Sequence, residues 1–271
     1  MTDDARALDE MIRVALAGCD LVRRHYAGEF RVEYKTGDDP VTAADRETNE
    51  LVCRARERAF PGVPIVAEES DASTFDVRRD AAECFFVDPL DGTRDYVARN
   101  GEFAVMIGLA RGGRAALGVV AAPVTGRVFA GGPGVPSIVI AADGSRRRVA
   151  PSHVELGRDA HALVSRSRTT QETLDTLARL GATRIDKMGS AGLKAVAVAC
   201  GEADVWIQCG AAGMVWDGCG PEAIVLGAGG VYGQRGGAAP DYANGPLDLA
   251  NLVVAATRPL FDAALAAMQL S

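Results

Sequence analysis

The stretch Asp88-Pro89-Leu90-Asp91-Gly92-Thr93 is the most informative part of this chain of 271 residues. The apolar run 84–87 precedes it and is typical of a buried strand, so Asp88 is expected at a strand end. A residue before proline prefers an extended backbone, and a helical turn starting at Gly92 would direct free N–H groups at phosphate oxygens. The stretch therefore predicts a combined metal and phosphate site.

Other carboxylates occupy similar positions. Glu68 follows the apolar run 63–67, and Asp217 follows Val215-Trp216. Carboxylates at the ends of buried strands repel one another, and they stay charged there only if a cation holds them. Hard oxygen ligands of this kind suit Mg²⁺ or Mn²⁺. We therefore expect a metal cluster that draws on both halves of the chain.

Each of these residues also has a purely structural interpretation. Asp91-Gly92 is an ordinary turn dipeptide, and Glu68-Glu69 could begin a solvated loop. Asp45 stands three residues after Thr42, as in a capping box, and Asp217 could cap the helix that follows it. The metal interpretation is favoured because most of the carboxylates share the same strand-end placement.

The rest of the chain predicts a mixed α/β fold. Apolar spacing predicts helices over 5–25 and from Thr42 to just before Pro61, while 31–41 is polar and rich in turn residues. Strands joined by glycine-containing turns indicate an antiparallel sheet in the first half, whereas alternating strands and helices indicate a more parallel layer in the second. The predicted strands are 63–67, 84–87, 103–110, 117–124, 127–130, 162–165, 183–186 and 203–208, and the later helices are 171–180, 190–200, 217–228 and 258–269.

The Gly- and Pro-rich stretch 131–136 predicts a domain boundary. We expect an N-terminal α+β domain, 1–135, with most of the metal ligands, and a C-terminal α/β domain, 136–271, that completes the site. The triplet 146–148, three arginines after Asp143-Gly144, is interpreted as a solvated turn.

Composition narrows the classes of partner. Acidic residues outnumber basic ones, 36 to 29, which argues against a nucleic-acid polymer but allows a small anion if bound cations supply positive charge. There is no signal-like start and no apolar run of the length that a membrane helix needs, so no membrane partner is expected. The six scattered cysteines lack CxxC pairing, which predicts reduced thiols and a cytoplasmic location.

Four ordered strings resemble the motifs of the inositol monophosphatase superfamily of lithium-sensitive phosphatases. They are DDPVTAAD (38–45), VAEES (66–70), DPLDGT (88–93) and WDGCGPEA (216–223). The resemblance implies a layered αβαβα sandwich. Three further strings are similar to the 3′(2′),5′-bisphosphate nucleotidase branch, of CysQ type: PLDGTRDY (89–96), VSRSR (164–168) and GSAGLKAVA (189–197).

The resemblance also implies roles for particular residues. Two or three Mg²⁺ ions, with Mn²⁺ as a possible substitute, would be held by Glu68, Asp88, the Leu90 carbonyl, Asp91 and Asp217. The catalytic set would be Asp45 and Thr93, which orient and deprotonate a water, and Glu69, which supports a neighbouring ligand. Substrate would be contacted by Gly92, Thr93, Gly189, Ser190 and Lys194. Lys35 is the candidate for a basic residue that relatives carry before the first motif.

The implied reaction is Mg²⁺-dependent hydrolysis of the 3′-phosphate of 3′-phosphoadenosine 5′-phosphate by a metal-activated water. Inositol phosphate, histidinol phosphate and fructose bisphosphate remain alternative substrates of the same fold, and both monomers and homodimers are compatible with it. A haloacid-dehalogenase phosphatase is disfavoured because its Asp-x-Asp spacing is one residue shorter than Asp88-x-x-Asp91. A non-catalytic phosphate-binding relative is disfavoured because none of the expected carboxylates is missing.

Overall fold

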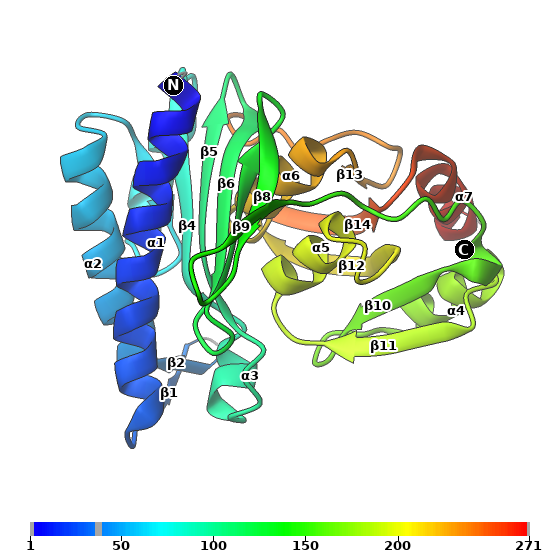
Figure 1. Ribbon diagram of the computed structural model, residues 1–271, viewed down its shortest axis with the longest axis horizontal. Coiled ribbons are helices and arrows are strands. Elements are labelled where there is room, and N and C mark those ends of the chain that lie inside the picture. The colour runs from blue at the N-terminus through cyan, green and yellow to red at the C-terminus, as the bar shows by residue number, and fades with distance from the viewer. Residues whose placement is uncertain (1–2, 36–39, 270–271) are drawn as a thin grey trace.

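The computed structural model describes residues 3–35 and 40–269, so Asp38 and Asp39 of the first motif lie outside the described residues. The chain forms five layers, helix, sheet, helix, sheet and helix (Figure 1). The mixed α/β class and the αβαβα sandwich are thereby confirmed. The helical layers are α1 (Asp3–Ala27) with α2 (Ala43–Ala59), then α5 (Ala191–Ala199) with α6 (Val215–Ala228), then α4 (Gln171–Leu180) with α7 (Arg258–Gln269).

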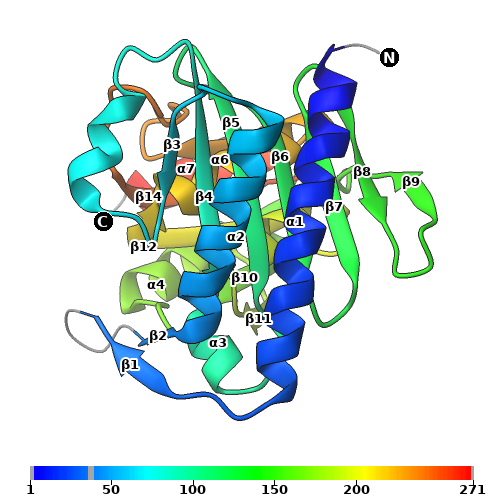
Figure 2. The same cartoon turned by 90° about the vertical axis from the view of Figure 1, so that its left-hand side faces the viewer.

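The outer helices α1 and α2 lie side by side across one face of the first sheet (Figure 2). Helix α1 buries Leu8, Met11 and Ile12 on that face, as its apolar spacing predicts. Helix α2 begins after Thr42, whose side chain accepts a hydrogen bond from the Ala44 N–H. The N-terminal helices therefore serve mainly to cover the sheet that carries the site.

The first sheet has seven strands in the order β3-β4-β5-β6-β7-β8-β9. Only β3 and β4 run parallel, and every later neighbour pairs antiparallel, as expected for this half. The strands are β3 (Ile65–Ala67), β4 (Glu83–Asp91), β5 (Ala104–Arg111), β6 (Arg114–Ala122), β7 (Arg127–Gly132), β8 (Val135–Ile140) and β9 (Arg146–Arg148). Short strands β1 (Val32–Tyr34) and β2 (Pro40–Thr42) form a separate ribbon from the predicted turn region.

The first sheet continues beyond the boundary predicted at residue 135. The Gly/Pro-rich stretch makes a hairpin in which Gly132 pairs with Val135, and β8 and β9 then extend the sheet. The interpretation of 146–148 as a turn is wrong, because these arginines form an exposed edge strand, where charge discourages pairing with another chain. A division into two domains stays a prediction, and its boundary would fall between Arg148 and His161.

The second sheet has five strands in the order β11-β10-β12-β14-β13. Strand β10 runs parallel to β11 and β12, as predicted, but β14 pairs antiparallel with β12 and β13, so the sheet is mixed. The sequence predicted neither β13 nor β14. The strands are β10 (His161–Ser165), β11 (Arg184–Met188), β12 (Val205–Met214), β13 (Val231–Gln234) and β14 (Asp248–Ala255).

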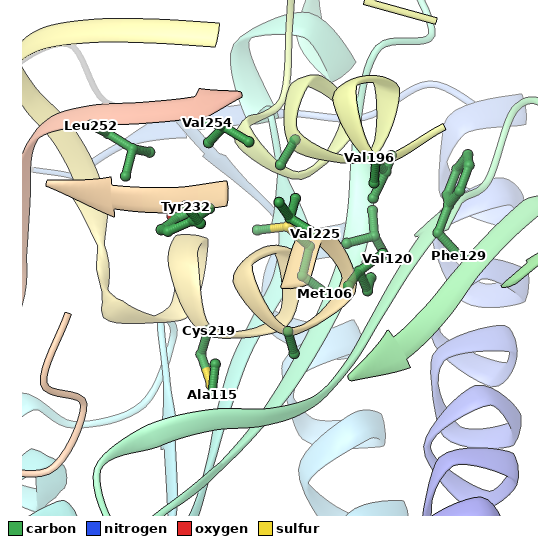
Figure 3. Close-up of a cluster of buried hydrophobic side chains, with 14 of the residues drawn as sticks. Met106, Ala115, Val120, Phe129, Val196, Cys219, Val225, Tyr232, Leu252 and Val254 are labelled. Carbon is green, nitrogen blue, oxygen red and sulfur yellow. The ribbon is translucent and has the colours of Figure 1, made fainter. Parts of the chain in front are cut away.

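The middle helices α5 and α6 are enclosed between the two sheets. Figure 3 shows Met106 and Val120 of the first sheet meeting Val196 of α5 and Val225 of α6 in one continuous core. Helix α6 lies so close to the first sheet that a Cβ on Gly118 would stand 2.0 Å from the carbonyl oxygen of residue 220. This close contact fixes the start of α6, and the aspartate on its first turn, beside the end of β4.

Within the described residues, no helix is both long and apolar enough to cross a membrane. All six cysteines are free thiols, as their spacing predicts.

Candidate active site

A cleft of about 720 Å³ opens between the two sheets, at the end of β4. Strand β4 was expected to end at Val87, yet it continues with irregular register to Asp91. Within this segment the Leu90 N–H donates to Asp88 Oδ1 at 2.8 Å. This bond ties the Asp88 side chain to the backbone two residues further along the strand. Asp88, Leu90 and Asp91 all line the cleft.

The predicted metal ligands meet on the floor of the cleft. Oxygen atoms of Asp88, Asp91 and Asp217 all lie within 4.8 Å of one another. Glu68, which directly follows β3, lines the same floor. Four of the five predicted ligand residues thus bring carboxylates together from three separate segments, and the fifth, Leu90, lies among them.

The electrostatics of this cluster fit a bound divalent cation. Burial, reinforced by the charges of Glu68 and Asp217, raises the pKa of Asp88 well above its usual range. Burial and the Asp91 charge raise the pKa of Asp217 to about 6, and burial likewise raises the pKa of Glu68 to about 7. Carboxylates so placed repel one another, and hard divalent cations both neutralise them and match their oxygen ligands. The residues present therefore fit Mg²⁺ or Mn²⁺.

Lys35 also belongs to this site. Its ammonium lies 3.1 Å from Glu68 Oε1 and contacts Glu69 as well. Burial lowers the pKa of Lys35, but the two carboxylates outweigh that effect and hold it above its usual range. Lys35 therefore partly neutralises the acidic cluster from the side of the β1–β2 ribbon. The proposed supporting role of Glu69 stays a prediction, but Glu69 does lie beside the metal-ligand candidate Glu68.

Asp45 both caps a helix and contacts the proposed catalytic residue Thr93. Its Oδ2 accepts from the Thr42 N–H at 2.8 Å and from the Thr42 hydroxyl at 2.7 Å, which is the predicted capping box. Its Oδ1 accepts from the Thr93 hydroxyl at 2.9 Å, and that hydroxyl also lies 3.1 Å from the Leu90 carbonyl oxygen. Burial raises the pKa of Asp45, although the bonds from Thr42 and Thr93 oppose the shift. One carboxylate thus caps a helix and aligns Thr93 at the metal cluster.

The turn at Gly92 forms one wall of the cleft. Gly92 adopts a left-handed conformation with φ +93° just before the short helix α3 (Thr93–Val97). A Cβ there would lie 2.9 Å from the Glu102 carbonyl oxygen, so the turn needs glycine for both conformation and space. Gly92 and Thr93 line the cleft beside the acidic floor, as the phosphate-binding prediction requires.

A second part of the cleft lining comes from the start of α5, which contacts Asp91 and Asp95. Gly189, Ser190 and Lys194 all line the cleft, as predicted for substrate contacts. Ser190 also donates its hydroxyl to Asp91 Oδ2. The Lys194 ammonium lies under the turn and bonds to the Ser190 carbonyl oxygen at 2.6 Å. Substrate contact by these residues stays a prediction.

Several cleft residues were missed by reasoning from the sequence. Arg168 stands at the end of the quoted VSRSR string, but nothing in that string distinguishes a cleft arginine from a surface one. Gln208 donates its side-chain N–H to the Arg168 carbonyl oxygen at 2.9 Å and sits on the predicted strand β12. Asp248 begins β14, which the sequence did not predict. The missed cleft residues include Ala72, Ser165, Ser167, Arg168, Trp206, Gln208, Ala211 and Asp248.

Comparison with known proteins agrees with this geometry. A sequence model described as the inositol monophosphatase family matches residues 4–270. The 3′(2′),5′-bisphosphate nucleotidase CysQ of Salmonella typhimurium is 32% identical over 237 residues, which cover 87% of this chain and 93% of that protein. The CysQ of Escherichia coli K12 is 32% identical over 82% of this chain and 88% of its own length.

Solved structures of inositol monophosphatase family members share the fold of this chain. The CysQ of Bacteroides thetaiotaomicron, 26% identical, superposes with a TM-score of 0.78 over 93% of this chain and 97% of that one. A Thermotoga maritima inositol monophosphatase, 23% identical, superposes with a TM-score of 0.82 over 97% of both chains. With its acidic cluster and these relatives, the chain belongs to the inositol monophosphatase family and is a metal-dependent phosphatase.

Proposed function

We propose that this chain hydrolyses the 3′-phosphate of a nucleoside 3′,5′-bisphosphate, with 3′-phosphoadenosine 5′-phosphate as the representative substrate. The observation that carries the proposal is the lining of one cleft, which combines the acidic metal cluster with Arg168, an exposed cation whose charge acts on Asp217. A volume of about 720 Å³ lies in the range of sites for ligands of nucleotide size. The CysQ names of the relatives at 32% identity support the same substrate class.

Glu68, Asp88, the Leu90 carbonyl, Asp91 and Asp217 would hold two or three Mg²⁺ ions. When bound, such ions lower the pKa of a water and neutralise charge on the reacting phosphate. The Thr93 hydroxyl, which donates to Asp45, would orient the attacking water by accepting its proton while its own proton moves to the Asp45 carboxylate. The N–H groups of the Gly92 turn bind the phosphate oxygens, and no protein nucleophile takes part. Inhibition by Li⁺ stays a prediction from the family resemblance.

A substrate panel tests the proposed specificity. Phosphate release should be at least about tenfold more efficient, in kcat/KM, with 3′-phosphoadenosine 5′-phosphate than with adenosine 5′-phosphate or inositol 1-phosphate. Replacing Arg168 by Met should lower kcat/KM for the bisphosphate about tenfold, because the second phosphate loses a cationic partner. The same variant should act normally on inositol 1-phosphate.

The exposed Arg158, which pairs only loosely with Asp159, provides a matched control as Arg158→Met. A higher kcat/KM for inositol 1-phosphate than for the nucleotide would contradict the proposed specificity and identify inositol phosphates as the substrates.

Metal removal should reverse the pH dependence of stability. The pKa values of Glu68 and Asp217, about 7 and about 6, lie above those of an unfolded chain. Between roughly pH 4 and 7 the folded state then binds more protons than the unfolded state, so its stability falls as the pH rises. Mg²⁺ takes the place of those protons and stabilises the folded state above that window.

We expect the Tm in EDTA to fall by about 3–8 °C between pH 5.5 and pH 8, and Mg²⁺ to raise it most at pH 8. Differential scanning calorimetry at both pH values, with and without Mg²⁺, measures this. Glu222, with a pKa of about 7 through burial, contributes a slope of the same sign that Mg²⁺ should not remove. Equal Tm shifts by Mg²⁺ at the two pH values would show that the carboxylates are not coupled to metal binding.

A further inference from the structure

The ammonium of Lys194 is enclosed beneath the turn that begins α5. Lys194 is only 2% exposed. Its Nζ lies 2.6 Å from the Ser190 carbonyl oxygen and 3.4 Å from those of Met188 and Gly189, and it stands 4.9 Å from the centre of the Trp206 ring. An ammonium has three N–H donors, and three carbonyl oxygens of one turn surround it. The Lys194 side chain therefore binds the backbone of the turn that precedes its own helix.

The turn that Lys194 holds is conformationally unusual. Ser190 has φ +54° and ψ 127°, outside the regions that L-residues favour. Gly189 is held from the other side, because its N–H donates to Glu102 Oε2 at 2.6 Å and a Cβ on it would meet the Asp95 carboxyl at 2.4 Å. Such a backbone persists only where the surrounding contacts enforce it. Lys194 supplies one of these contacts, through the bonds from its ammonium to the carbonyl oxygens of the turn.

The same turn orients a metal-ligand candidate. The Ser190 hydroxyl and the Gly192 N–H both donate to Asp91 Oδ2, the latter at 2.8 Å. Two donors on one oxygen fix the rotation of the carboxyl group and thereby the direction of Oδ1. Groups that hold a ligand in this way commonly tune metal affinity.

We propose that Lys194 is a positioning residue for Asp91, because it holds the Ser190 turn in the conformation from which Ser190 and Gly192 orient that carboxylate. The inference rests on the metal site of the proposed function and is independent of the substrate. Its positive charge also lies in the field of Asp91 and Asp217, which lessens the repulsion within the cluster. Lys194 would therefore act on metal binding even when no substrate is present.

Mn²⁺ binding without substrate tests this role. Free Mn²⁺ is measured by electron paramagnetic resonance as the ion is titrated into Lys194→Met and into the unaltered protein. We expect roughly 10–100-fold weaker binding at one site of the variant, the range seen when groups supporting metal ligands are removed. Lys187→Met, which removes an exposed ammonium on the neighbouring strand β11, should bind Mn²⁺ normally.

Two further variants test the same role if Lys194→Met does not fold. Lys194→Gln keeps an N–H donor for the turn and should bind Mn²⁺ more tightly than Lys194→Met. Ser190→Ala removes the hydroxyl from Asp91 and should weaken Mn²⁺ binding by a similar factor. Combining Ser190→Ala with a Lys194 change should add little, since both act through one turn.

Unaltered Mn²⁺ affinity in both folded Lys194 and Ser190 variants would overturn the proposal. A rise in KM for the nucleotide alone, without any change in Mn²⁺ binding, would make Lys194 a substrate contact. Failure of the nucleotidase assignment would appear only in the substrate panel, because the Mn²⁺ titration contains no substrate.

Discussion

Asp88→Asn is expected to lower phosphate release about a thousandfold or more while leaving the protein folded. Asp88 is buried, and the charges of Glu68, Asp217 and Asp91 all act on it. Asparagine has the same shape, and its amide oxygen can still accept the Leu90 N–H bond now made at 2.8 Å. It has only one oxygen and no charge, so metal binding and its share of catalysis are lost together.

The stability of this variant separates catalysis from folding. Removing one charge from a cluster of repelling carboxylates should leave the metal-free Tm unchanged or raise it. The stabilisation by Mg²⁺ should be lost at the same time. Phosphate release, circular dichroism and thermal melting with and without Mg²⁺ measure the three effects, with the exposed Asp159→Asn as the matched control. An active Asp88→Asn variant would remove the metal cluster from the mechanism.

The floor of the cleft could be predicted because strand ends are visible in a sequence. Short apolar runs before Glu68 and Asp88 marked two strands, although the parallel pairing of β3 with β4 was not predicted. Parallel neighbours bring their ends to one edge, so the two carboxylates meet there. The close contact of α6 with the first sheet then places Asp217 beside them.

The supporting contacts could not be predicted, because they join residues far apart in the chain. Ser190 reaches Asp91 across 99 positions, and Lys35 reaches Glu68 across 33. Neither pair has a local pattern that would indicate it. Lys194 shows the consequence: its motif suggested a substrate contact, whereas the described structure gives its ammonium three backbone carbonyls.

The errors in the fold have local physical causes. Gly and Pro between β7 and β8 suggested a linker, but the same residues make a tight hairpin within the sheet. The run LANLVVAA at 249–256 has no alternation, since most of β14 is buried and lies inside the second sheet between β12 and β13. A buried strand of this kind cannot be distinguished from a buried helix by periodicity alone.

Thr93→Val is expected to lower kcat about 100–1000-fold with little loss of metal affinity. Valine has nearly the shape of threonine and keeps the start of α3, but it lacks the hydroxyl that lies 2.9 Å from Asp45 Oδ1. The attacking water then loses the group that orients it and passes its proton to Asp45, a contribution in the usual range for general base catalysis. Asp45→Asn should cost a similar factor, and the double variant little more, because the two residues act as a unit.

The capping role of Asp45 requires a separate control. Thr42→Val removes the hydroxyl that bonds to Asp45 Oδ2 and to the Ala44 N–H, but leaves the contact between Thr93 and Asp45 in place. We expect it to lower the free energy of unfolding by about 1 kcal/mol while kcat stays within a few-fold. Steady-state kinetics with Mn²⁺ titration on all three single variants makes the comparison. If Thr42→Val and Thr93→Val reduced kcat equally, the loss would come from the helix cap, and Thr93 would have no chemical role.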